Sequence, residues 1–288
     1  RDWSSDVCSS DLVFHGDITS QLWCISSPDR GESWGEPRLL HAPFGGASQD
    51  ANLFRDGDKL WANSFVWRFV PEATARAMAG TTAAQYLHPY LTQMVPGGTY
   101  VTMSSDRGRR WSDPGYPEPV PGMAQILPGI PLRLHNRGNI VRLDDGRMLL
   151  AGQILGFLPE FHSTVGVYES RDDGRSWTYL CTAADDLGTG VFEEPFLAVT
   201  PQGRWVVLMR THRDTDGTRW ERAKLYRTVS DDGGKSWSKP ENLGFHGKPP
   251  TAQRLDDGRW LVAYGYRLPD GPDRKSTRLN SSHDQISY

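Results

Sequence analysis

One eight-residue pattern, Ser-x-Asp-x-Gly-x-x-Trp, occurs four times in this sequence and limits the folds that the chain can adopt. Its copies are Ser27–Trp34, Ser104–Trp111, Ser170–Trp177 and Ser230–Trp237. The tryptophans that end successive copies lie 77, 66 and 60 residues apart. Self-similarity at a regular spacing is the sequence signature of a repeat architecture, in which each repeat is one supersecondary unit. We therefore expect a chain built from similar units stacked side by side.

The residue types of the pattern are those of a tight turn between two strands. The aspartate side chain accepts backbone N–H groups within its own turn, and the glycine adopts a positive φ without steric cost. The aspartates are Asp29, Asp106, Asp172 and Asp232, and the glycines are Gly31, Gly108, Gly174 and Gly234. We expect the final tryptophan to begin the next strand and to pack between neighbouring sheets.

A second repeat alternates with the first and consists of two apolar segments joined by a glycine turn. Its four copies are residues 51–65, 139–153, 197–210 and 251–266, with turns at Gly57, Gly146, Gly203 and Gly258. Each period therefore holds two hairpins, or four strands, which is one blade of a β-propeller. The 11 Trp, 30 Gly and 20 Pro agree with an all-β chain rich in turns. We predict about four blades within residues 13–274.

Composition excludes several classes of partner and predicts a boundary near each end. The net charge of −3 gives no reason to expect nucleic acid or an anionic membrane as a partner. The sequence contains no run of about 18 apolar residues, so it predicts no helix that is inserted in a membrane. The three cysteines have no metal-ligand spacing, and no metal or cofactor is expected. Residues 1–12 and 275–288 are Ser-rich, lack strand alternation and resemble translated adapter sequence. We interpret both as non-native segments, the alternative being genuine disordered termini.

The four Asp-box turns, with the Gly-turn hairpins between them, resemble the sialidase (neuraminidase) superfamily, including its BNR-repeat members. The resemblance extends over nearly all of residues 13–274 and implies a six-bladed propeller. Four blades then imply a chain that is incomplete at both ends. The resemblance favours a secreted or periplasmic location. In this superfamily the Asp boxes mark the fold and lie on the face away from the active site, so the chemistry must be sought elsewhere.

Position along the repeat indicates which residues meet at the ligand face. We take the strand before each second-repeat turn as the innermost strand, so candidates lie seven to ten residues before the turn glycine. These candidates are Asp50, Arg137, Glu194 and Lys248. Polar residues at equivalent places in four blades are expected to converge around one axis.

The resemblance assigns roles to two residues of the segment 192–210. Sialidases bind the sugar carboxylate with three arginines and use a Tyr nucleophile assisted by a Glu. By resemblance Glu194 is that Glu and Arg210 is one of the arginines. Glu193 competes with Glu194, and strand alternation is expected to point only one of the two inward. The nucleophilic Tyr is expected beyond the fourth Asp box, and Tyr266 lies too early to be assigned. The alternatives are a salt-bridged rim carboxylate and a strand-end arginine.

The other candidates follow looser similarities. Asp50 resembles an Asp that contacts substrate hydroxyls, the alternative being a turn cap. Asp17 lies where an acid/base Asp is found, the alternative being a strand cap. Lys248 stands where another arginine is expected and would bind a carboxylate as a point charge. His246 is assigned to sugar hydroxyls, the alternative being a surface role.

These observations predict an exo-α-sialidase-like glycoside hydrolase that removes sialic acid or a related anionic sugar from glycans with retention of configuration. A non-catalytic carbohydrate-binding or assembly propeller is the alternative from another class. A glycoside hydrolase or lyase of unrelated specificity is a third reading, because fold does not fix function.

Overall fold

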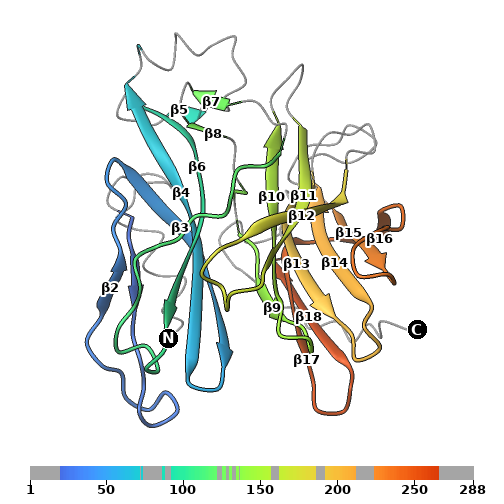
Figure 1. The fold of residues 1–288 in the computed structure, drawn as a ribbon, viewed down its shortest axis with the longest axis horizontal. Helices are drawn as coiled ribbons and strands as arrows, with labels where there is room; N and C mark the ends of the chain where they lie inside the picture. Colours follow the sequence, from blue (N-terminus) through green and yellow to red (C-terminus); the bar gives the residue numbers. More distant parts are fainter. Residues whose placement is uncertain are drawn as a thin grey trace, which may run out of the picture.

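The computed structural model of the chain describes residues 20–71, 73, 86–87, 92–121, 125–127, 130–131, 134–135, 137–156, 162–185, 192–211 and 224–265. The elements that these residues form, β1 to β18, are all strands, and they are arranged as antiparallel sheets standing side by side (Figure 1). This confirms the predicted all-β class.

Three of the sheets have four strands each. The first has the order β3-β4-β6-β5, with β3 (Gly46–Asp56), β4 (Lys59–Pro71), β5 (Tyr86–Leu87) and β6 (Thr92–Ser104). The second runs from β9 (Ile140–Arg142) through β10 (Met148–Gly156) and β11 (His162–Ser170) to β12 (Thr178–Ala184). The third runs from β13 (Phe192–Val199) through β14 (Trp205–Thr211) and β15 (Lys224–Ser230) to β16 (Glu241–His246).

Three further sheets have two strands each. They are β1 (Leu22–Cys24) with β2 (Arg38–His41), β7 (Gln125–Leu127) with β8 (Ile130–Pro131), and β17 (Lys248–Arg254) with β18 (Trp260–Gly265). The pair β1–β2 flanks the first Asp box, and the pair β17–β18 flanks the turn at Gly258.

The second and third sheets show how one sequence period becomes one sheet. The glycine turn joins the first strand to the second, and the Asp box joins the third to the fourth. Because all the pairings are antiparallel, both kinds of turn lie at the same end of a sheet, which is the lower end in Figure 1. The first strand therefore starts, and the second strand ends, at the opposite end, where the ligand face was predicted.

The Asp boxes have the hydrogen bonds that their residue types predict. Asp232 accepts the backbone N–H of Ser236 at 2.9 Å and the hydroxyl of Ser230 at 2.8 Å. Equivalent bonds occur at Asp29, Asp106 and Asp172. The box glycines all have positive φ, from 82° at Gly108 and Gly174 to 96° at Gly31. The local turn chemistry thus follows from the repeated motif.

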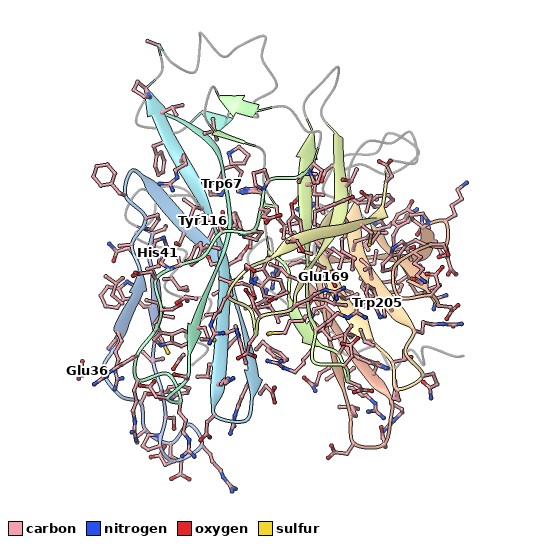
Figure 2. All side chains as sticks on the ribbon, viewed as in Figure 1. Glu36, His41, Trp67, Tyr116, Glu169 and Trp205 are labelled. Carbon is pink, nitrogen blue, oxygen red and sulfur yellow. The ribbon has the colours of Figure 1, made fainter. Side chains whose placement is uncertain are left out.

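Apolar side chains fill the space between neighbouring sheets. Figure 2 draws the side chains on the ribbon, with Trp205 of one such cluster labelled. Trp177 packs with Trp61 between the first and second sheets, and Trp237 packs near Trp205 between the second and third. The expectation that every box tryptophan packs between sheets is wrong for Trp34, which is 59% exposed. That residue lies in the turn between β1 and β2, where the described residues provide no sheet to cover it.

The predicted count of about four blades, the six-bladed closure and the boundaries at residues 12 and 275 stay predictions. The two terminal segments lie outside the described residues. Among the residues that are described, no helix is long and apolar enough to cross a membrane.

Candidate functional site

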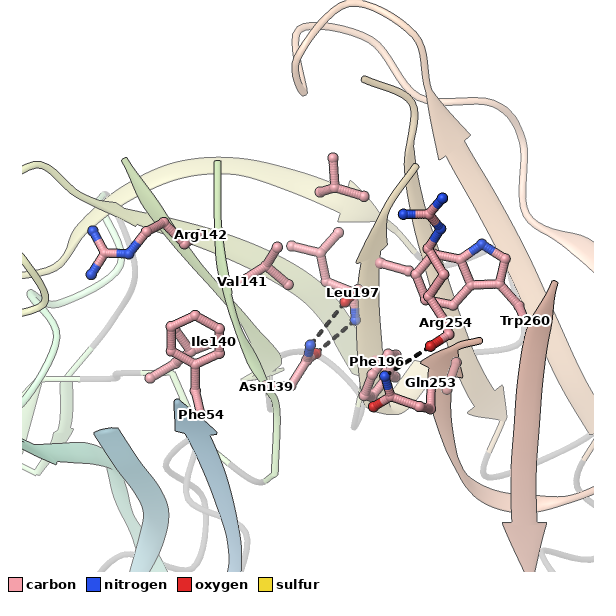
Figure 3. Close-up of a pocket in the computed structure, with 13 residues that line it drawn as sticks. Phe54, Asn139, Ile140, Val141, Arg142, Phe196, Leu197, Gln253, Arg254 and Trp260 are labelled. Atoms are coloured by element: carbon pink, nitrogen blue, oxygen red, sulfur yellow. Dashed lines mark hydrogen bonds between the residues drawn. The ribbon is translucent and has the colours of Figure 1, made fainter. Parts of the chain in front are cut away.

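The first strands of four sheets surround one hollow. A cavity of about 320 Å³ is lined by residues of β3, β9, β13 and β17, with Trp260 from β18 (Figure 3). Most of its lining residues are apolar, and the polar ones are Asn139, Arg142, Gln253 and Arg254. The first strands are therefore the innermost ones. Asp50, Arg137, Glu194 and Arg210 are not among the residues that line this cavity.

Each first strand is interrupted near its start by a change of pairing register. The shifts fall between Gln49 and Asn52 in β3, between Glu193 and Phe196 in β13, and between Lys248 and Pro250 in β17. In the second sheet His135 forms an isolated bridge with Gln153, and regular pairing starts again only at Ile140. Such bulges re-aim side chains and are common next to active sites.

Three of the predicted site residues lie inside these interruptions. Asp50 and Glu194 have φ values of 48° and 50°, which residues other than glycine rarely adopt. Arg137 lies in the longer break before β9 and is partly buried. Asp50 is exposed. A residue held at such a rarely adopted φ costs about 1–3 kcal/mol, and residues of this kind cluster at functional sites. The bulges are therefore candidates for a functional role as well as a structural one.

Arg210, at the end of β14, is held by two carboxylates. Its Nε lies 2.5 Å from an oxygen of Glu194, and its Nη1 lies 2.5 Å from an oxygen of Glu193. The three side chains are 13%, 15% and 8% exposed. Charge-assisted bonds to a guanidinium in so sheltered a place are strong and directional, so the Arg210 side chain is fixed in orientation.

Both glutamates pair with Arg210, so strand alternation, from which we expected only one of them to point inward, does not separate their side chains here. Alternation holds for a regular strand, but the bulge in β13 puts two residues, Glu194 and Pro195, where a regular strand has one. The left-handed backbone of Glu194 then turns its side chain to the side of Glu193. Pro195 is the sequence signal for this bulge, because a proline cannot donate to a ladder and is confined to edges and bulges.

The remaining predicted residues are placed less completely. Lys248 begins β17 opposite Gly265, and its side chain lies outside the described residues. His246 is in β16, the fourth strand of its sheet, opposite Lys224 and therefore three strands away from the innermost one. Asp17 and Tyr266 also lie outside the described residues. Within the part of the chain that is described, no three His, Cys, Asp or Glu side chains are grouped as metal ligands would be.

Comparison with known proteins identifies the fold and the family. The family of BNR repeat-like domains matches residues 73–288. A protein of unknown function from Dyadobacter fermentans is 29% identical, with a TM-score of 0.74 over 90% of this chain and 68% of that one. No curated protein matches the chain.

Two sialidases share the fold at lower identity. The NanB sialidase of Streptococcus pneumoniae is 14% identical, with a TM-score of 0.58 over 96% of this chain and 58% of its own. The Hadza microbial sialidase Hz136 is 17% identical, with a TM-score of 0.54 over 86% of this chain and 48% of its own. The chain thus spans about half the length of these two enzymes. Because the family match extends over well over half of the sequence, the chain belongs to the family of BNR repeat-like domains.

Proposed function

We propose that this chain is the propeller of an exo-acting glycoside hydrolase that removes a terminal sialic acid, or a related anionic sugar, with retention of configuration. The observation that carries the proposal is the cluster of Glu194, Glu193 and Arg210 at the ligand-face end of the innermost hairpin. The similarity to the two sialidases supports the scaffold. The chemistry rests on this cluster and on the residues at the neighbouring bulges.

In the proposed mechanism Glu194 accepts the phenolic proton of a tyrosine, which attacks the anomeric carbon of the sugar. A neutral phenol meets less repulsion from an anionic sugar than a carboxylate nucleophile would. Asp17 donates a proton to the leaving oxygen and then takes one from the water that releases the sugar. Asp50 contacts sugar hydroxyls, whereas His246, on the outermost strand of its sheet, is assigned no contact with the sugar.

The charge around Arg210 adds a requirement to the proposal. One guanidinium between two carboxylates leaves a net charge of about −1, which by itself repels a sugar carboxylate. Arg137, at the adjoining bulge, and Lys248, at the start of β17, are therefore assigned to supply the positive charge that binds the anion. An arginine suits this role better than a lysine because its fork matches a carboxylate bidentately.

The test is release of the fluorophore from an aryl α-sialoside by the purified protein, with an aryl α-L-arabinofuranoside as the neutral comparison. We expect Glu194→Gln to lower kcat by about 10²–10⁴-fold, the range for a lost acid–base group. Arg137→Ala, at a residue assigned to bind the sugar carboxylate, should mainly raise KM. Circular dichroism shows whether each variant is folded. Full sialoside release by folded Glu194→Gln would contradict the assignment.

The same cluster supports a second candidate, a carbohydrate-binding propeller without catalysis. An arginine fixed between two carboxylates is also a common structural ion cluster, and it would orient a binding surface without any turnover. Sugar binding measured by calorimetry, with no release from any aryl glycoside tested, would favour this function over the hydrolase.

A further inference from the structure

The break before β9 joins the innermost strands of three sheets. The carbonyl oxygen of Gly138 accepts the side-chain amides of Asn52 at 2.6 Å and of Asn63 at 2.9 Å. Asn52 and Asn63 face each other across β3 and β4, directly after the bulge that contains Asp50. The first sheet is therefore fastened to the residue that follows Arg137.

Asn139 makes the matching connection to the third sheet. Its side-chain nitrogen donates to the carbonyl of Leu197 at 2.8 Å, and its side-chain oxygen accepts the N–H of Leu197 at 2.7 Å (Figure 3). Asn139 is 9% exposed. The side-chain amide thus pairs with the inner edge of β13 as another strand would, three residues after Glu194.

The backbone at this point has no room to move. A Cβ atom on Gly138 would lie 1.6 Å from the carbonyl oxygen of Ala151, so only glycine fits this close approach. Both polar atoms of the buried Asn139 amide are paired with Leu197, and breaking these bonds would leave unpaired polar groups that cost about 1–3 kcal/mol each, so this amide holds one arrangement. The contacts of Gly138 and Asn139 therefore form a fixed node among the three bulges.

From this geometry we infer that Asn139 is a positioning residue, which sets the location of Glu194 relative to Arg137 and Asp50 by pinning β13 at Leu197. Neighbouring sheets of any propeller must contact each other. The contacts of Asn139 differ because they are polar, run in both directions between its side-chain amide and the backbone of Leu197, and lie at the level of the bulges. Apolar packing between the second and third sheets is supplied elsewhere, by Leu149, Val167 and Val207 among others. This inference rests on the proposed function only for its effect on catalysis.

The first measurement needs no substrate. Hydrogen exchange followed by mass spectrometry is compared between Asn139→Ala and Asn242→Ala. Asn242 is an exposed residue of β16 whose amide donates to the hydroxyl of Tyr226 at 3.2 Å, so its variant loses an amide outside the node. We expect faster exchange in residues 192–199 for Asn139→Ala alone. Equal exchange of that segment in both variants would overturn the inference, whether or not the protein is an enzyme.

The second measurement uses the aryl α-sialoside. We expect Asn139→Ala to lower kcat by about 10-fold to 100-fold with KM within about threefold, because small displacements of a catalytic group cost that much. In a Glu194→Gln background the same substitution should have little further effect on kcat, since both changes remove one function. Additive losses, or an unchanged kcat despite faster exchange, would refute a role through Glu194. If the wild type releases no aryl group from the sialoside, the proposed hydrolase function is rejected. The hydrogen-exchange comparison alone then decides whether Asn139 positions β13.

Discussion

His135 is a buried imidazole with no hydrogen-bond partner on either ring nitrogen among the described residues. It is 1% exposed, and the rings of Phe65 and Trp67 form T-shaped contacts with it. Their ring centroids lie 4.7 and 4.6 Å from the centroid of the imidazole. Trp67 is labelled in Figure 2 towards the upper part of the molecule. Because burial opposes the charged form, the pKa of His135 is lowered to about 3.

This lowered pKa predicts a loss of stability at mildly acidic pH. An unfolded chain protonates this histidine below about pH 6.5, whereas the folded protein does not until about pH 3. Between these values unfolding takes up a proton, so stability should fall by up to about 1.4 kcal/mol per pH unit. We expect His135→Phe to remove this part of the slope in urea unfolding curves recorded from pH 7 to pH 4. An equal slope in both proteins would contradict the assignment.

The Asp-box carboxylates predict a second pH effect, at lower pH. The side-chain and backbone bonds from Ser236, followed by the Ser230 hydroxyl, lower the pKa of Asp232 to about 2. The stabilisation by the ionised form is therefore complete above about pH 4 and is lost as the pH falls towards 2. Asp232→Ala should lower the Tm at pH 7, and its Tm should differ less from that of the wild type at pH 2. Thermal melts followed by circular dichroism measure both differences.

The bulge in β13 makes a prediction about backbone strain. Glu194→Ala and Glu194→Gly remove the same carboxylate, but only Ala keeps a Cβ at the positive φ of this position. In an ordinary strand Gly is less stable than Ala by about 0.5–1 kcal/mol. Here we expect the reverse, with Glu194→Gly more stable by about 1 kcal/mol. Chemical unfolding of the two variants decides the sign, and a more stable Ala variant would show that the bulge relaxes.

The strand order and turns of this chain were predictable because their causes are local. Asp172 accepts bonds from residues three and four positions along, and Gly174 needs only its own positive φ, so the motif carries its own geometry. The pairing of both Glu193 and Glu194 with Arg210 was not predictable from strand alternation, because the position of a bulge depends on the partner strand. Pro195 was the visible hint. The node at Gly138 has no local pattern, since its partners Asn52 and Leu197 are far away in the sequence.

The lower ends of the first and second sheets are joined by a different kind of contact. Arg142 forms ion pairs with Asp56 at 2.7 Å and with Asp173 at 2.6 Å, and its guanidinium lies 5.1 Å from the ring centroid of Trp61. The indole N–H of Trp61 donates to the carbonyl of Asp173 at 3.0 Å. The Asp-box end therefore locks neighbouring sheets together, while the amide node joins the innermost strands near the proposed ligand face.

The pair β1–β2 presents an apolar surface that predicts how the molecule behaves in solution. Trp23 and Leu39 face each other across this pair, so they lie on one side, and they are 52% and 48% exposed. Trp34, in the turn between the strands, is 59% exposed. Large exposed apolar patches favour association. We therefore expect the chain to self-associate as its concentration rises.

Sedimentation velocity over a range of protein concentrations tests this expectation. Trp23→Lys with Leu39→Lys should shift the protein towards monomer, because two charges then lie on the surface that associates. Leu53→Lys is the matched control, since Leu53 is 65% exposed but lies on β3, outside the patch. If the control dissociates the protein as well as the double variant does, the contact is charge-sensitive but not centred on β1–β2. A wild type that stays monomeric throughout would show that the exposed pair attracts no second molecule.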